Sequence, residues 1–205
     1  MGKQSLILVG AGGHARSCID VVEQTGLFKV AGMIGSIEEV SSAFLGYKVI
    51  GTDEQLPDLV KRYKNALVAV GQIKSPGKRI EIYDRLLEIG FELPVIISPH
   101  AYVSRFAKLG QGTIVLHGAI INAGVDVGIN CIINTHSLIE HDSKIGDHCH
   151  ISTGAVINGD VTIGSHTFIG SASVVKHGCS VAENCIIDMG TVVKGNYGNQ
   201  GQVFQ

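Results

Sequence analysis

The stretch IGDHCHISTGAVINGDVTIGSHTFIGSASV, residues 145–174, consists of five copies of a six-residue unit that begins with isoleucine. The same register runs from Ile97 to Val193, and each of its seventeen positions holds Ile, Val or Leu. Four residues after each position, from Ala101 to Thr191, stands Ala, Ser, Thr, Cys or Val. An unbroken internal repeat of this period predicts a parallel β-helix, in which each coil stacks on the one before it.

The residue types of the repeat explain how such a coil closes. One hexad forms one short side, three sides form a coil of about eighteen residues, and neighbouring coils lie about 4.8 Å apart. The branched residue fills the centre, and the small residue packs near a corner, where a larger side chain would clash. Residues 97–193 are therefore expected to form between five and six coils without a long external loop.

The register also places four of the five cysteines. They occupy the small inner position, where cysteine packs as a small hydrophobic residue: Cys131, Cys149, Cys179 and Cys185. Cys18 falls in a predicted helix and is expected in the core there. No C-x-x-C pair is present, so neither a disulfide framework nor a zinc ribbon is predicted.

Residues 1–92 follow a different pattern, in which strand-like and helix-like segments alternate. The expected strands cover 5–10, 28–34 and 65–71, and the expected helices cover 14–26, 56–64 and 76–90. This order predicts a small parallel α/β sheet of the Rossmann type. The predicted fold class is therefore an α/β half-Rossmann domain over residues 1–92, followed by an all-β parallel β-helix over residues 93–205. The C-terminal tail of the second domain is expected to cap the open edge of the last coil.

The bulk composition excludes several classes of function. The net charge is −2 and no block of five like charges occurs, which argues against a protein that binds nucleic acid or membrane surfaces by electrostatics. No signal peptide is recognisable, and no apolar stretch reaches the roughly 18 residues that a membrane-spanning helix needs. The expectation is a soluble cytoplasmic protein.

Two motifs connect the chain to a known family: GAGGHA at 10–15 and EHDSKIGDHCHIS at 140–152. With the hexads IGDHCH, IGSHTF and IGSASV, they make the chain resemble the hexapeptide-repeat acetyltransferases that modify nucleotide-activated 4-amino sugars, and their relatives described as sialic acid O-acetyltransferases. The resemblance implies a left-handed β-helix and a homotrimer with active sites between neighbouring β-helices. It also implies acetyl-CoA as co-substrate and a nucleotide sugar as acceptor, in bacterial polysaccharide biosynthesis.

The GAGGHA motif fits G-x-G-x-x-A between a strand and a helix, where glycines let backbone N–H groups approach a phosphate. A dinucleotide site also needs an acidic residue at the end of the second strand, where Gly35 and Ser36 stand, so NAD is not expected. The resemblance instead assigns Gly12, Gly13 and His14 to the nucleotide sugar. The loop 70–79 either contributes Lys74 or Arg79 near the phosphates or is a solvated loop.

His141 is the expected catalytic base, because the resemblance places the family's base at this position and an acidic residue, Asp142, after it. Imidazole suits the task, since an amino-sugar nitrogen must lose a proton as it attacks a thioester near neutral pH. A neighbouring carboxylate orients the ring. Adjacent side chains diverge in a flat strand, so Asp142 reaches His141 only if the chain turns there; Glu140 is the alternative partner.

The resemblance assigns three further residues to acetyl-CoA: His150 near the thioester, and Gly159 and Ser171 in the cleft between subunits. The spacing of nine residues is expected to place His141 and His150 on adjacent sides around one corner. His148 precedes His166 by one coil, so the two are expected to stack on an outer face. A metal site there would need a third ligand, and none is evident.

In the predicted reaction, the 4-amino group of a nucleotide-linked 4-amino-4,6-dideoxy sugar attacks acetyl-CoA directly, with His141 as base. No Ser or Cys stands where it could act as a nucleophile, so a covalent acyl-enzyme intermediate is not expected. Two alternatives stay open: O-acetylation of a sialic-acid-type sugar, and a non-catalytic trimeric scaffold that binds nucleotide sugars.

Overall fold

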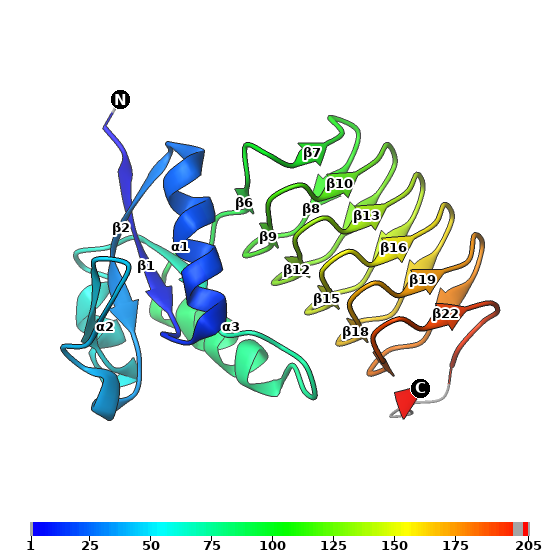
Figure 1. The fold of residues 1–205 in the computed structure, drawn as a ribbon. Helices are drawn as coiled ribbons and strands as arrows, with labels where there is room; N and C mark the ends of the chain where they lie inside the picture. Colours follow the sequence, from blue (N-terminus) through cyan, green and yellow to red (C-terminus); the bar gives the residue numbers. More distant parts are fainter. Residues whose placement is uncertain (1, 199–202, 205) are drawn as a thin grey trace.

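The computed structural model describes residues 2–198 and 203–204. The N-terminal unit (residues 2–92) contains a sheet of strand order β3-β4-β2-β1-β5, and helices flank it (Figure 1). Its strands are β1 (Gln4–Val9), β2 (Phe28–Ile34), β3 (Ala43–Phe44), β4 (Tyr47–Gly51) and β5 (Asn65–Val68). Its α-helices are α1 (Gly13–Thr25), α2 (Leu56–Leu59) and α3 (Gly77–Ile89), with short 3-10 turns η1 (Ile37–Glu39) and η2 (Asp53–Gln55). The parallel pairing of β1 with β2 and β5 confirms the α/β prediction.

Two details of this unit differ from the prediction. The helix expected over 56–64 ends at Leu59, because the chain turns there to enter β5 beside β1. The hairpin of β3 and β4 was not predicted, since its turn is Leu45–Gly46, both with positive φ, and not the Asn-Gly or Asp-Gly pair that signals such turns.

The second half is the left-handed β-helix that the repeat and the resemblance predicted. Between Ile96 and Val193 a two-residue strand recurs every six residues, and each strand that begins between residues 96 and 174 pairs in parallel with the strand eighteen residues later, as Ile132 does with His150. The strands form three sheets, named here by what their outer faces carry.

The covered sheet contains β6 (Ile96–Ile97), β9 (Ile114–Val115), β12 (Ile132–Ile133), β15 (His150–Ile151), β18 (Phe168–Ile169), β21 (Ile186–Ile187) and β23 (Val203–Phe204). The apolar sheet contains β7 (Tyr102–Val103), β10 (Ile120–Ile121), β13 (Leu138–Ile139), β16 (Val156–Ile157), β19 (Val174–Val175) and β22 (Val192–Val193). The polar sheet contains β8 (Lys108–Leu109), β11 (Asp126–Val127), β14 (Lys144–Ile145), β17 (Thr162–Ile163) and β20 (Ser180–Val181).

The inner column of the β-helix is the predicted core. From Val115 to Val193 every residue at the six-residue step is buried, and the four cysteines of this half are buried free thiols. The first positions depart from the expectation, since Ile97 is 37% exposed, because no coil lies beyond the first one to cover it.

The N-terminal unit packs against the covered sheet. The outer row of that sheet reads Ile96, Ile114, Ile132, His150, Phe168 and Ile186. Its first three members share a hydrophobic core with α1, which lies beside this face (Figure 1). His150 therefore stands where this row leaves the common core.

The division at residues 92 and 93, and the role of the tail as a cap, remain predictions. Within the described part of the tail, Tyr197 packs against the β-helix core and β23 pairs with β21. Residues 199–202 and 205, which belong to the predicted cap, lie outside the described residues.

Candidate active site

The glycine-rich loop forms one wall of a cleft between the N-terminal unit and the covered sheet. Gly12 is the N-cap of α1 and Gly13 its first residue, and a Cβ added to either would meet nothing within 4 Å. The backbone N–H groups of the helix terminus are thus open to an anion. The cleft has a volume of about 470 Å³ and extends from this loop to Gly71, Gln72 and His150.

His14 also lines this cleft, and its assignment to the nucleotide sugar stays a prediction. Its Nε2 is buried and has no hydrogen-bond partner among the described residues. Burial, with the nearby charges of Arg79 and His150, lowers the pKa of His14 to about 3. The ring is therefore neutral at any working pH, and Nε2 is available to a bound molecule.

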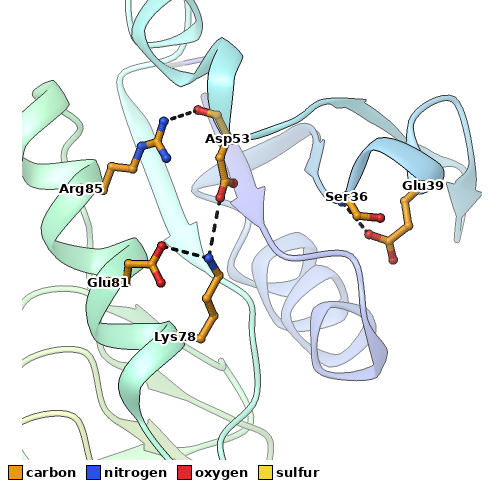
Figure 2. Close-up of polar contacts among 6 residues, drawn as sticks. All are labelled: Ser36, Glu39, Asp53, Lys78, Glu81 and Arg85. Atoms are coloured by element: carbon orange, nitrogen blue, oxygen red, sulfur yellow. Dashed lines mark hydrogen bonds and ion pairs between the residues drawn. The ribbon is translucent and has the colours of Figure 1, made fainter.

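A second cavity, of about 340 Å³, lies on the other side of the same loop, at the carboxyl ends of β1 and β2. Glu39 accepts a hydrogen bond from the backbone N–H of Ser36 at 2.8 Å, and Lys78 lies 4.0 Å from Asp53 (Figure 2). No acidic residue stands directly at the end of β2, but the fold brings Glu39 and Asp53 to this cavity. No signal in the sequence placed Asp53 there, since it comes from the next connection of the sheet.

His150 is buried between the two halves of the chain. Its Nδ1 lies 2.7 Å from the backbone oxygen of Gln72, to which it donates, so Nε2 is the acceptor for the Asn134 amide at 3.0 Å. Burial lowers the pKa of His150 to about 4. Both ring nitrogens are thus occupied within the chain, and a contact with acetyl-CoA would require Asn134 to release Nε2.

His148 and Arg79 depart from their predicted surroundings. His148 stacks on His166 with ring centroids 5.6 Å apart, as expected, but it is only 7% exposed, because Tyr83 of α3 covers it. Arg79 is 1% exposed and donates to the backbone oxygens of Val70 and Asn130. It therefore joins α3 to the β-helix and is not a phosphate ligand.

His141 stands on an exposed corner of the β-helix. The chain turns there, with Asp142 at a φ of 60°, and the two side chains meet: Nδ1 of His141 lies 2.9 Å from a carboxylate oxygen of Asp142. This hydrogen bond raises the pKa of His141, and the charges of Asp142, Glu140 and Asp160 act in the same direction. The carboxylate fixes the ring with Nδ1–H as donor, which leaves Nε2 as a proton acceptor.

Gly159 lies one coil beyond His141 on the same corner. A Cβ at Gly159 would stand 2.6 Å from Nε2 of His141, so glycine is what leaves room for the ring. His177, one coil further, has its ring centroid 6.4 Å from that of His141. These residues form the apolar–polar corner (residues 141–142, 159–160 and 177–178), which joins the apolar sheet to the polar sheet.

The predicted residues other than Ser171 fall into two groups on opposite sides of the β-helix. His14, Gly12, Gly13 and His150 line the cleft at the covered sheet. The apolar–polar corner follows β13 and β16, on the side away from the N-terminal unit (Figure 1). The expectation that His141 and His150 share one corner is therefore wrong within a single chain, because β14 and a second corner lie between them.

Ser171 belongs to a third location. It lies in the covered–apolar corner (residues 153–154, 171–172 and 189–190), and its hydroxyl is 3.0 Å from that of Ser152. Gly159 and Ser171 are thus on different corners of one β-helix. The apolar sheet lies between these two corners.

Two properties bear on membranes and metals. Among the described residues no helix combines the length and apolar character needed to cross a membrane. In the same part of the chain no three His, Cys, Asp or Glu side chains converge as a metal site would require.

Two family models match the chain, one in each half. Residues 5–86 match the model of the PglD N-terminal domain, and residues 160–195 match that of the bacterial transferase hexapeptide (six repeats). No curated protein matches the sequence significantly.

Several solved structures share the whole architecture. PerB from Caulobacter crescentus, in complex with CoA and GDP-perosamine, is 29% identical, with a TM-score of 0.90 over 97% of this chain and 92% of that one. The acetyltransferase domain of PglB from Neisseria gonorrhoeae, in complex with acetyl coenzyme A, is 28% identical, with a TM-score of 0.89 over 98% and 96%. WeeI from Acinetobacter baumannii, 17% identical with a TM-score of 0.71 over 93% and 95%, shows the shared fold. Over nearly its whole length the chain is therefore similar to acetyltransferase structures, with one segment that matches a PglD N-terminal domain and one that matches bacterial transferase hexapeptide repeats.

Proposed function

We propose that the chain is an acetyl-CoA-dependent N-acetyltransferase that acts on the 4-amino group of a nucleotide-linked 4-amino-4,6-dideoxy sugar. The observation that carries the proposal is the His141–Asp142 pair, an exposed imidazole held by a carboxylate at 2.9 Å. The solved relatives support the substrate class, since they include a perosamine N-acetyltransferase in complex with CoA and GDP-perosamine and an acetyltransferase domain in complex with acetyl coenzyme A.

The nucleotide fits the N-terminal unit. Its phosphates would lie at the N–H groups of Gly12 and Gly13, at the positive end of α1. The cavity of about 340 Å³ at Ser36, Glu39 and Asp53 would receive the ribose and base, and the cleft toward His150 would receive the sugar.

His141 would act as the general base. Its Nε2 accepts the proton that the sugar nitrogen loses as that nitrogen attacks the thioester carbonyl. Collapse of the tetrahedral adduct forms the amide and breaks the carbon–sulfur bond, and the protonated His141 returns its proton to the leaving thiolate. The raised pKa of His141 favours the protonated ring that forms in this step.

The three faces of the β-helix support the predicted homotrimer. The N-terminal unit occupies the covered sheet, and the polar sheet shows Lys, Asp, Thr and Ser outward. The remaining face has an apolar outer row whose members are half-buried or exposed: Tyr102, Ile120, Leu138, Val156, Val174 and Val192. Tyr102 is 59% and Val192 53% exposed. A row of this kind on a regular face suits packing against further copies of the chain around a three-fold axis.

That packing would complete the active site. With the apolar sheets around the axis, the apolar–polar corner of one subunit adjoins the covered–apolar corner of the next. His141 and Gly159 of one chain then approach Ser171 and the nucleotide cleft of its neighbour. Acetyl-CoA would lie between the two corners, which is how Gly159 and Ser171 can both line its site.

The test is acceptor-dependent release of the CoA thiol. The purified protein is mixed with acetyl-CoA, a thiol reagent and, one at a time, UDP-, dTDP- and GDP-linked 4-amino-4,6-dideoxy sugars, including GDP-perosamine, and free sialic acid. The proposal expects thiol release with a nucleotide 4-amino sugar and an acetylated product by mass spectrometry. Release with sialic acid alone, or with no acceptor, would contradict it.

A further inference from the structure

Gln72 is a buried polar residue whose side chain has no partner. It is 3% exposed, and neither its amide nitrogen nor its amide oxygen has a hydrogen-bond partner among the described residues. Leaving a buried polar group unpaired is unfavourable, because the group loses its hydrogen bonds to water, and native structures contain few such groups. Both ends of one amide left unpaired indicate a partner that the free chain does not supply.

The position of Gln72 shows where that partner would bind. The residue lines the cleft of about 470 Å³ that begins at the glycine-rich loop. Its backbone oxygen accepts the Nδ1–H of His150 at 2.7 Å, so the residue is attached to the covered sheet at the far end of this cleft. On its other side is a cavity of about 190 Å³ bounded by Phe168 and the loop 73–76.

We propose that the side chain of Gln72 binds the pyranose ring of the nucleotide sugar; this assignment rests on the proposed function. An amide is both donor and acceptor, and a sugar hydroxyl is as well, so one or two hydroxyls satisfy both ends. A phosphate only accepts and would leave the amide oxygen unpaired. The base is placed on the opposite side of the glycine-rich loop. The terminal torsion of glutamine is soft, so the amide turns toward the ligand without moving the backbone.

The assignment makes stability and binding change in opposite directions. Gln72→Met keeps the length of the side chain and removes the two unpaired groups, so the free protein is expected to melt about 2–4 °C higher. The same variant loses two hydrogen bonds to the sugar, and its KM for the nucleotide sugar is expected to rise about tenfold. Binding of the bare nucleoside diphosphate stays within about twofold, because that part of the ligand does not reach residue 72. Gln24→Met, on the exposed face of α1, is the matched control and changes neither quantity.

The experiment measures the melting temperature of each protein without ligand. KM and kcat are measured with GDP-perosamine, or with whichever nucleotide sugar of the panel the wild type acetylates. Calorimetry gives the Kd of the matching nucleoside diphosphate. A higher melting temperature together with a higher sugar KM and unchanged nucleotide Kd supports the assignment. Gln72→Met with an unchanged KM, or with equal losses for sugar and bare nucleotide, overturns it while the proposed function stands. A wild type that acetylates no sugar contradicts the proposed function, which removes the ground for this role as well.

Discussion

His141 and His150 are nine residues apart, yet the β-helix gives them opposite surroundings. The side chain of His141 is 58% exposed and has a raised pKa beside a carboxylate. His150 is 7% exposed, has both nitrogens engaged and a pKa lowered to about 4. The difference comes from position in the coil, because one residue stands on a corner and the other on a face that a second unit covers. His141 is therefore suited to proton transfer, whereas His150 is suited to holding the loop at Gln72.

Removal of the exposed imidazole of His141 is expected to have the largest effect on activity. His141→Ala is expected to lower kcat by about 10²–10⁴-fold, the usual contribution of a positioned general base, with an unchanged fold, because the side chain has no role in the core. Steady-state kinetics and circular dichroism measure the two properties. His100→Ala, which truncates another exposed histidine, is the control. Activity close to that of the wild type in His141→Ala would show that the corner is not the reacting site.

The second largest effect is expected from separating the subunits. Val156→Asp puts a charge in the outer row of the apolar sheet, and burying an unpaired charge in an interface is strongly unfavourable. The trimer and the activity should be lost together. Thr162→Asp makes the same change at the same coil position on the polar sheet and should leave both unaffected. Light scattering after size-exclusion chromatography gives the mass. A Val156→Asp protein that remains trimeric would exclude this face as the interface.

A smaller effect is expected from crowding the ring. In Gly159→Ala the new Cβ would stand 2.6 Å from Nε2 of His141, so the ring must move and kcat/KM should fall about 100-fold, as misplacement of about 1 Å typically causes. Gly195→Ala is the control, since it lies further along the same corner with nothing within 4 Å of its added Cβ. Equal activities in the two variants would mean that the position of the ring is not critical.

The smallest change in activity is expected from Asp142→Asn. It is measured as the dependence of kcat/KM on pH. Only neutral His141 can accept a proton, so activity falls as the pH drops below its pKa. Asp142 raises that pKa above the ordinary value of 6.5. Its replacement should therefore move the acidic limb of kcat/KM to lower pH and lower the plateau about tenfold. His14 and His150, with pKa values of about 3 and 4, are neutral throughout. An acidic limb that stays in place would assign it to another group.

The β-helix was predictable from the sequence to the level of single residues, because each coil repeats the same packing. The six-residue register placed the buried column and the inward cysteines, and it set His148 beside His166. The same register could not show that α3 covers His148, since what lies on a face depends on a different part of the chain.

The candidate site was predictable only where it follows the repeat or the motif. His141 with Asp142, and the loop of Gly12 and Gly13, came from local patterns, and the structure adds the turn that joins the first pair. Glu39, Asp53 and Gln72 were missed, because each reaches its cavity through the packing of separate segments. The hairpin of β3 and β4 was not predicted, because its turn lacks the residues that usually signal a hairpin.

If one active site takes residues from two chains, mixing two inactive variants should restore activity. His141→Ala lacks the base, and Gly12→Phe fills the cleft, where an added side chain has open space, without disturbing the core. The two proteins are dissociated, mixed in equal amounts and reassembled, and acetylation of the nucleotide sugar is measured. Recovery of about one quarter of the wild-type activity is expected, because each of the two contributions is intact in half of the chains. Activity no higher than that of the separate variants, in trimers shown to be mixed, would contradict a site shared between subunits.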